Sequence, residues 1–287
     1  MPLDVYKGIE GSFLEYPESG TPALYREYRE DEIPEVDRRE VLRYAGIPLH
    51  VLRNKENRKK DADACGEKSD KTGGQLSKSG EQLNNSCEKP ADTGEQLSDS
   101  GINSSLSEPD GLLDSGLLKL LERSVSITCG AMSYRVSYIY APIRWEPAED
   151  EAFPILPFEQ YSRALKRNLE GCTGVVIFAA TAGAGIDRLI RRYEKSEPSC
   201  GAFLQAIGAE RVEALCDKFN EEVKEAARSY GFETRPRFSP GFADFYLAVQ
   251  PEILSLVNAQ RRLGITLDSS LLMSPSKSVT GIIGLRR

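Results

Sequence analysis

The sequence predicts an α+β fold, in which helices and strands follow one another without a regular strand-helix-strand alternation. Apolar residues recur at helical spacing in several stretches, and two continuous apolar runs, at residues 174–180 and 278–285, have the length of strands. A polar, repetitive segment also interrupts the 287-residue chain. Together these observations predict a single α+β domain that carries a long insertion.

The insertion covers residues 54–114. It is rich in Ser, Gly, Asn, Lys and Glu, and it repeats related units: GGQLSKS, GEQLNNS and GEQLSDS. A segment with so few aromatic and β-branched residues cannot bury enough apolar surface to offset its chain entropy. We therefore predict a disordered insertion at 54–114, a domain formed by residues 31–53 and 115–287, and an N-terminal extension at 1–30.

The first elements of the domain follow from local patterns. Residues 35–46 predict a short amphipathic helix, because Asp37 is a suitable N-cap and Gly46 is a suitable C-terminal stop. Residues 124–140 mix β-branched and aromatic side chains in partial alternation, which predicts two strands broken near Cys129.

The second half of the chain contains most of the predicted helices. Apolar spacing predicts helices at residues 158–169, 185–193, 208–229 and 248–263. The two apolar runs lie before and after these last three helices, and the first run is expected to be a strand buried on both faces.

Composition excludes several classes of partner. The formal net charge of -7 argues against binding to a nucleic-acid backbone or to an anionic membrane surface. No stretch is apolar enough to span a membrane, and the first residues lack the basic-then-apolar order of a secretory signal. A soluble cytoplasmic protein is expected.

Metal and nucleophilic sites are disfavoured by the residues that would have to form them. The six cysteines include no CxxC pair, so reduced thiols are expected. His50 is the only histidine and has no partner at i+4, which argues against a zinc site or a His-based triad. We predict no catalytic side chain and no metal ligand.

The loop TAGAG, at Thr181–Gly185, lies between a predicted strand and a predicted helix. Such a loop can bind the phosphates of a nucleotide. An acidic residue at the end of a second strand, about twenty positions on, would be needed to bind the ribose, and the sequence there is polar and rich in turn residues. We favour the other interpretation, in which small residues allow the helix to pack closely on the strand.

The segment RFSPGFADF, at residues 237–245, combines Arg237 and Asp244 with a Pro-Gly turn. An arginine and a carboxylate on either side of a turn can bind a zwitterion. It is followed by the polar segment SPSKSVT at residues 274–280.

These segments carry a resemblance to a known family. In the same order, VDRREVLRYAG, SRALKRNLEGC, VVIFAATAGAGIDRLIRRY, AIGAERVEALCD, RFSPGFADF and LDSSLLMSPSKSVTGIIGL are similar to the activation, or reactivation, domain of cobalamin-dependent methionine synthase. The chain resembles a stand-alone form of that domain. The resemblance implies a central, mostly antiparallel and curved sheet flanked by helices.

The resemblance also implies an S-adenosylmethionine site. An acid before the first helix, a glutamate on a long helix and an Arg-x-x-x-Gly-Tyr segment bind this ligand in the family. By order and context, the corresponding residues are Asp37, Glu213, Arg237, Ser239, Gly241 and Phe242. A carboxylate suits the ligand's ammonium group, and an arginine suits its carboxylate. Asp37 could instead serve only as an N-cap, and Glu213 could be a solvated charge on the helix surface.

Two further features concern the edges of this site. Phe242 replaces the family's tyrosine, so ring stacking is retained and a hydroxyl is lost. In the family the last loop lies near the ligand or the docked cobalamin, which implies such a role for Lys277, Ser278 and Thr280. The hydroxyls of Ser274 and Ser276 belong to the same loop, which is also compatible with a simple polar turn.

The implied function is reductive methylation of inactive cob(II)alamin to methylcobalamin, with S-adenosylmethionine as the methyl donor. The chain has no Asp-x-His-x-x-Gly corrinoid motif and no flavin fingerprint. Cobalamin is therefore expected in trans, on a methionine synthase that lacks its own activation domain, and the electron from a flavodoxin or a ferredoxin. The chain would then be one component of a methyltransferase system. The alternatives are a non-catalytic corrinoid- or ligand-binding accessory protein and a reactivator of another corrinoid methyltransferase.

Overall fold

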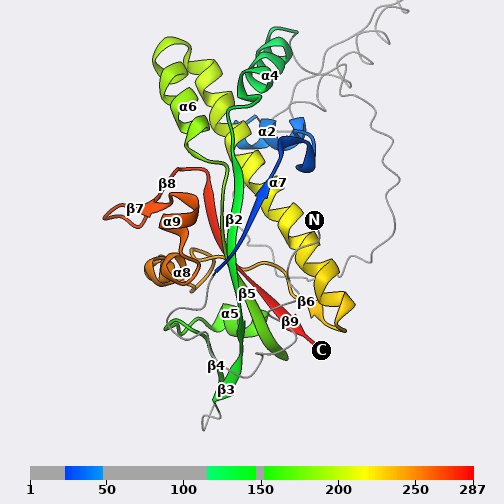
Figure 1. Cartoon of the computed structure of the whole chain (residues 1–287). Helices are drawn as coiled ribbons and strands as arrows, with labels where there is room; N and C mark the ends of the chain where they lie inside the picture. Colours follow the sequence, from blue (N-terminus) through cyan, green and yellow to red (C-terminus); the bar gives the residue numbers. More distant parts are fainter. Residues whose placement is uncertain (1–22, 48–114, 147–151) are drawn as a thin grey trace, which may run out of the picture. The chain divides into compact units, whose positions relative to one another are not determined.

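The computed structural model describes residues 23–47, 115–146 and 152–287 (Figure 1). All of them belong to one of the chain's two units, which comprises Met1–Leu49 and Asp114–Arg287. The other unit, His50–Leu113, lies outside the described residues, and so does the whole of the predicted insertion at 54–114. His50 and the predicted disorder of residues 54–114 therefore remain predictions from the sequence.

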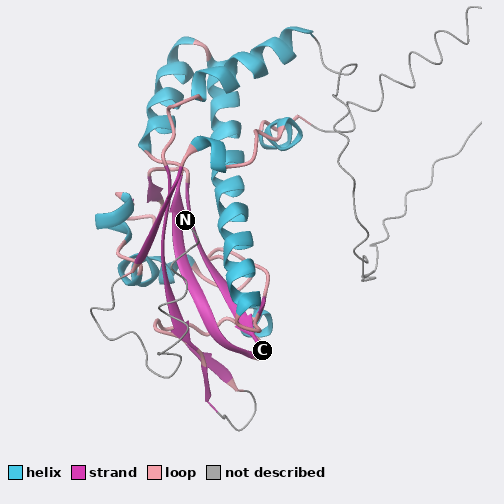
Figure 2. Cartoon of the chain, turned by 45° about the vertical axis from the view of Figure 1, so that its right-hand side comes forward, coloured by secondary structure: helices cyan, strands magenta, loops and turns pink. Residues whose placement is uncertain are grey.

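A five-stranded antiparallel sheet forms the centre of the described unit. Its strand order is β1-β2-β5-β9-β6. The strands are β1 (Leu24–Tyr28), β2 (Tyr134–Pro142), β5 (Cys172–Thr181), β6 (Glu233–Thr234) and β9 (Ser278–Arg286). Figure 2 shows the long strands bending along their length. The predicted α+β class with an antiparallel, curved sheet is confirmed.

The edge strand β1 lies within residues 1–30, which the sequence analysis placed in an N-terminal extension. It pairs with β2 from Leu24↔Tyr138 to Tyr28↔Tyr134. Tyr28 is buried, and its hydroxyl donates to Glu222 on the long helix at 2.8 Å. The folded unit therefore begins before residue 31.

Helices cover both faces of the sheet (Figure 1). Alternate residues of β5 point to opposite sides, so that Val176 and Phe178 contact α7 (Pro198–Ser229), and Val175 and Ile177 pack on the other face. That second face is covered by α5 (Arg163–Asn168), α8 (Gln250–Leu256) and α9 (Ala259–Leu263). The prediction of a strand buried on both sides is confirmed.

Two strands were predicted within residues 124–140, and the prediction of the first one is wrong. Residues up to Thr128 belong to a helix, α4 (Ser115–Thr128), and only β2 is a strand. Leu121 of α4 is buried, and Ile127 packs against a small apolar cluster that includes Cys200 of α7. The β-branched residues thus form a helix because its apolar face packs on α7, which outweighs their strand propensity.

Two predicted helices differ from the observed ones, one in its first residue and one in its continuity. The helix predicted at 158–169 begins later, because Ser162 is the N-cap of α5 and accepts a hydrogen bond from the Leu165 amide at 3.0 Å. The helix predicted at 248–263 is divided into α8 and α9 by Asn258, whose φ of 50° is left-handed. A short 3₁₀ turn, η2 (Leu247–Val249), precedes α8.

The predicted helices at 185–193 and 208–229 are present and longer, as α6 (Ala184–Ser196) and α7. The remaining elements are α2 (Arg38–Tyr44), η1 (Glu30–Glu32), β3 (Arg144–Glu146), β4 (Phe153–Ile155), β7 (Thr266–Leu267) and β8 (Met273–Ser274). No helix in the described part of the chain is long and apolar enough to cross a membrane.

The TAGAG loop connects β5 to α6, and its glycines pack closely on the segment before β2. Gly183 has a φ of 79°, which favours glycine, and it precedes the first turn of α6. A Cβ atom added to Gly185 would lie 1.7 Å from the carbonyl oxygen of Ala131. The glycines therefore allow the backbones of two segments to approach each other, as the packing interpretation predicts.

Candidate functional site

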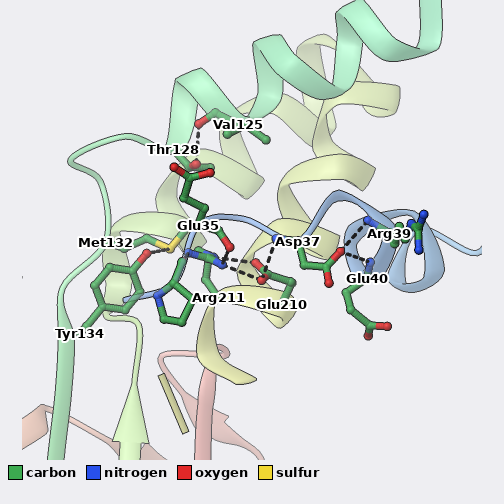
Figure 3. A network of polar contacts seen from close by, with 11 residues as sticks. Glu35, Asp37, Arg39, Glu40, Val125, Thr128, Met132, Tyr134, Glu210 and Arg211 are labelled. Carbon is green, nitrogen blue, oxygen red and sulfur yellow. Dashed lines mark hydrogen bonds and ion pairs between the residues drawn. The ribbon is translucent and has the colours of Figure 1, made fainter. Parts of the chain in front are cut away.

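The N-terminal part of α2 is attached to α7 by a buried ion pair between two consecutive residues (Figure 3). The Arg211 guanidinium donates two hydrogen bonds of 2.6 Å to the carboxylate of Glu210, and both side chains are only 6% exposed. Arg211 also donates to the carbonyl oxygens of Pro34 at 2.5 Å and Glu35 at 3.0 Å. We call these contacts the Arg211 clamp, because they hold the segment before α2 against α7.

Asp37 lies where the clamp meets α2. Its amide donates to Glu210 at 3.2 Å, and its own carboxylate accepts from the amides of Arg39 at 2.8 Å and Glu40 at 3.2 Å. The predicted N-cap role of Asp37 is therefore observed. The cap directs the first turn of α2 over α7, on the side where Glu213 and Arg237 lie.

Arg237 and Glu213, which are 24 positions apart, are brought together by the packing of α7 on the sheet. The Nη2 atom of Arg237 lies 2.5 Å from Oε2 of Glu213. The Nη1 atom of Arg237 is buried and has no hydrogen-bond partner among the described residues. The guanidinium also lies beside the Cys216 thiol, whose pKa burial raises to about 12. An arginine with one paired and one unpaired nitrogen is thus fixed at the base of a surface cavity.

This cavity has a volume of about 350 Å³ and lies between α2, α7 and Arg237. Most of its lining is charged or aromatic: Glu40, Arg43, Tyr44, Glu210, Glu213, Ala214, Asp217 and Arg237. Two of the predicted site residues, Glu213 and Arg237, line it directly. Asp37 borders it through its bonds to Glu40 and Glu210.

Ser239, Gly241 and Phe242 form the turn that follows Arg237 and do not line this cavity. The turn is held by backbone hydrogen bonds, from the Gly241 amide to the Phe245 carbonyl at 2.7 Å and from the Phe242 amide to the Ser239 carbonyl at 3.2 Å. Gly241 has a φ of 96°. Phe242 is 63% exposed, so the turn presents an aromatic residue to solvent.

Asp244 does not take part in the cavity. Its carboxylate accepts from the Ser162 hydroxyl at 2.6 Å and from the amides of Arg163 at 2.8 Å and Ala164 at 3.1 Å. These hydrogen bonds hold the pKa of Asp244 below its ordinary value of 3.8. The acid in the RFSPGFADF segment therefore caps α5, and the pairing of Arg237 with Asp244 around one ligand is not what the structure shows.

The last predicted loop lies apart from the cavity. The buried hydroxyl of Ser278 bonds to Thr181 at 2.9 Å, and that of Thr280 bonds to Gln250 at 3.1 Å. The Lys277 ammonium donates to Gln205 at 2.8 Å, and burial lowers its pKa. Ser274 and Ser276 are exposed, but neither lines the cavity. These contacts account for the buried hydroxyls as parts of the sheet and its packing.

Neither the Arg211 clamp nor Asp217 was predicted from the sequence. Glu210 and Arg211 are neighbours in the sequence, where opposite charges usually belong to a solvated helix surface, and no local signal shows that both are buried. Asp217 is one turn after Glu213 on α7, so it lies on the same helix face. That spacing could have identified it once Glu213 was selected.

A comparison with family models agrees with the resemblance. The family model for the vitamin B12-dependent methionine synthase activation domain matches residues 164–286, which include α7, Glu213 and Arg237. No curated protein matches the chain in a sequence search. A solved structure described as the MetH reactivation domain bound to AdoHcy has 17% identity and a TM-score of 0.45, covering 59% of this chain and 64% of that one. The resemblance to the activation domain is thus confirmed over the matched segment.

Proposed function

Starting from the match of residues 164–286 to the methionine synthase activation domain, we propose that this chain binds S-adenosylmethionine. It then supports reductive methylation of inactive cob(II)alamin to methylcobalamin on a partner. The partner is a cobalamin-binding methionine synthase without its own activation domain, and a flavodoxin or ferredoxin supplies the electron. The observation that carries the proposal is the Arg237–Glu213 pair in the cavity beside α2.

This pair suits the amino-acid end of S-adenosylmethionine. That end is a zwitterion, with a carboxylate that an arginine can bind through two parallel hydrogen bonds and an ammonium that a carboxylate can bind. Binding would exchange one ion pair for two: Arg237 turns to the ligand carboxylate and Glu213 accepts from the ammonium. When the guanidinium turns, its Nη1, which is buried and has no hydrogen-bond partner among the described residues, would become the second donor.

The main role of the chain in this reaction is to position the methyl donor, S-adenosylmethionine. The methyl group of a sulfonium is already electrophilic, and cobalamin held by a partner supplies the nucleophile. Arg237 and Glu213 would hold one end of the donor, and the α2 side of the cavity, with Tyr44 39% exposed, would fix its direction. Orientation of this kind can account for a large share of a rate enhancement without an acid or a base.

Titration calorimetry with S-adenosylmethionine tests the binding step. We expect Arg237→Ala to weaken binding by about 10- to 150-fold, since a charge-assisted hydrogen bond is worth roughly 1.5–3 kcal/mol. Arg123→Ala is the matched control, because Arg123 forms an exposed ion pair with Glu197 and does not line the cavity. Equal affinities for the parent and both variants, or no binding by the parent, would refute the proposal.

A spectroscopic assay tests the reaction. Candidate corrinoid proteins carrying cob(II)alamin are mixed with S-adenosylmethionine and a reductant, with and without this chain, and methylcobalamin is followed by absorbance. Formation only with the chain is expected for a methionine synthase partner. Formation with a different corrinoid methyltransferase would identify that class as the partner instead.

The exposed ring of Phe242 favours one alternative, a non-catalytic corrinoid- or ligand-binding accessory protein. A phenylalanine at this position supplies no hydroxyl, and the residue is 63% exposed. If the chain binds S-adenosylmethionine but no tested partner is methylated, and Phe242→Tyr restores methylation, the accessory function is supported.

A further inference from the structure

A second hollow region lies between β4, the segment that precedes α5, and the first turn of α8. It consists of two adjoining cavities of about 710 Å³ and about 290 Å³. The residues that line both cavities are Glu159, Gln160, Tyr161 and Glu252. We call the pair the α5–α8 groove. Its lining includes Phe158 and Phe245 from the core on the sheet face that α7 does not cover, so the groove is separate from the cavity that Arg237 lines.

The α5–α8 groove is negatively charged. Its lining includes Glu146, Glu159, Asp244 and Glu252 but no arginine or lysine, and none of these acids forms an ion pair with any described residue. Glu159 accepts a hydrogen bond from the Tyr161 hydroxyl at 2.8 Å, and Glu252 accepts one from the Glu159 amide at 3.3 Å. Since an ionised carboxylate has about four lone-pair sites, both can accept from a further donor. The groove therefore attracts a cation.

Two tyrosines in the lining determine which cation fits. Tyr161 is 77% exposed and Tyr246 is 73% exposed, so both present aromatic surface to a ligand. The planar guanidinium of arginine can stack on an aromatic ring and donate to a carboxylate at the same time, whereas the ammonium of lysine is a compact and strongly hydrated charge. Exposed aromatic rings beside carboxylates thus favour arginine over lysine.

The shape of the groove favours a peptide. Two cavities in a row can hold neighbouring residues of an extended chain, and the larger one is lined by the apolar residues Phe153, Pro154 and Leu156. Extended segments rich in proline bind to aromatic-lined grooves, because their conformation is already formed and little entropy is lost. An arginine in one cavity and an apolar residue or proline in the other would fill the groove.

We propose that the α5–α8 groove binds an extended, arginine-containing segment of a partner protein. The guanidinium lies on Tyr161 and donates to the carboxylates of Glu159 and Glu252. The inference goes beyond the proposed function and does not depend on it, because no residue of the α5–α8 groove lines the cavity beside α2.

Fluorescence anisotropy with a labelled, capped peptide in which arginines alternate with prolines tests this inference. The parent protein should bind the peptide, and more weakly as salt is added. Tyr161→Ala should weaken binding by about 2- to 5-fold, the loss typical of a cation–π contact at an exposed site. Tyr161→Phe keeps the ring and should bind as the parent does. Glu252→Gln should weaken binding by up to about fivefold, as expected for an exposed charge pair.

Tyr25→Ala is the matched control. Tyr25 is 40% exposed and its hydroxyl bonds to Glu27, an acid two positions away, as in the pair of Tyr161 with Glu159, but it does not line the groove. Its affinity for the peptide should equal that of the parent. A peptide with glutamate in place of arginine should not bind. No binding of the arginine peptide by the parent at low salt, or equal losses in Tyr25→Ala and Tyr161→Ala, would overturn the inference.

Two further measurements exclude other occupants. If free arginine amide binds as tightly as the peptide, the groove is a site for a small cation, and the inference is wrong. Self-association in sedimentation velocity that Tyr161→Ala abolishes would identify a second copy of this chain as the occupant and would also overturn it. Calorimetry with S-adenosylmethionine separates the two proposals, because Tyr161→Ala should leave that affinity unchanged. A parent that binds the peptide but not S-adenosylmethionine would refute only the proposed function, and the reverse result only this inference.

Discussion

Breaking the Arg211 clamp should be among the most destabilising changes in the described unit. Arg211→Met removes the only cation that bonds to Glu210 among the described residues, leaves a carboxylate whose side chain is 6% exposed, and deprives two carbonyl oxygens of a donor. Removing one partner of a buried ion pair costs about 3–5 kcal/mol, because the remaining charge is left in a poorly solvated position. Pro34 and Glu35 are exposed, so water can replace the donor to their carbonyls and they add little.

Urea unfolding followed by circular dichroism measures this loss. With a denaturant dependence of about 2–3 kcal/mol per molar urea, the transition midpoint should fall by roughly 1–2.5 M. The double variant Glu210→Gln with Arg211→Met should recover part of the loss, because it removes the buried charge and keeps an acceptor for the Asp37 amide. Arg43→Ala is the surface control, with an exposed i,i+3 pair worth less than about 1 kcal/mol.

A midpoint for Arg211→Met within about 0.3 M of that for Arg43→Ala would refute the reasoning. So would a double variant less stable than the single one. Arg211→Met should also weaken ligand binding, because α2 forms one wall of the cavity and is held there by the clamp.

Three further predictions concern turns and caps. Gly185→Ala should lower stability by at least about 2 kcal/mol in urea unfolding, because its Cβ would lie 1.7 Å from the Ala131 carbonyl oxygen and α6 must shift. Gly241→Ala should cost about 1 kcal/mol through its φ of 96° alone, since its Cβ would be 3.5 Å from Leu247, an ordinary contact; a loss above about 3 kcal/mol would show a steric clash instead. Asp244→Asn should be less stable than the parent at pH 7, and since the folded pKa lies below 3.8, the difference should shrink as the pH falls below that value; an unchanged difference at pH 2 would contradict the capping role.

Much of the fold could be predicted because its strongest signals are local. The central strands β5 and β9 are continuous apolar runs, and α2 begins after an N-cap at Asp37 and ends before Gly46, as its sequence indicates. The break at Asn258 was missed because the apolar spacing continues from α8 into α9. The left-handed conformation of one residue changes the direction of the chain without changing that spacing.

The helix α4 and part of the cavity could not be predicted from local sequence patterns. Residues 124–128 have strand propensity, and only their packing on α7, far along the chain, makes them helical. The joining of Arg237 with Glu213 was expected from the family resemblance, whereas the burial of Arg211 depends on residues 34–37 lying across α7. Such long-range contacts leave no periodic trace in a single sequence.

The Arg211 clamp also bears on how the protein could be engineered. It fixes α2 through residues 34–37, upstream of the helix, so the position of α2 does not rely on the connection that follows it. The entropy of closing a loop grows slowly with its length, by about 0.6 kcal/mol for each doubling. A circularly permuted fluorescent protein inserted within residues 54–114 would therefore leave the cavity wall in place. Such a fusion should label the protein without changing ligand binding between α2 and α7.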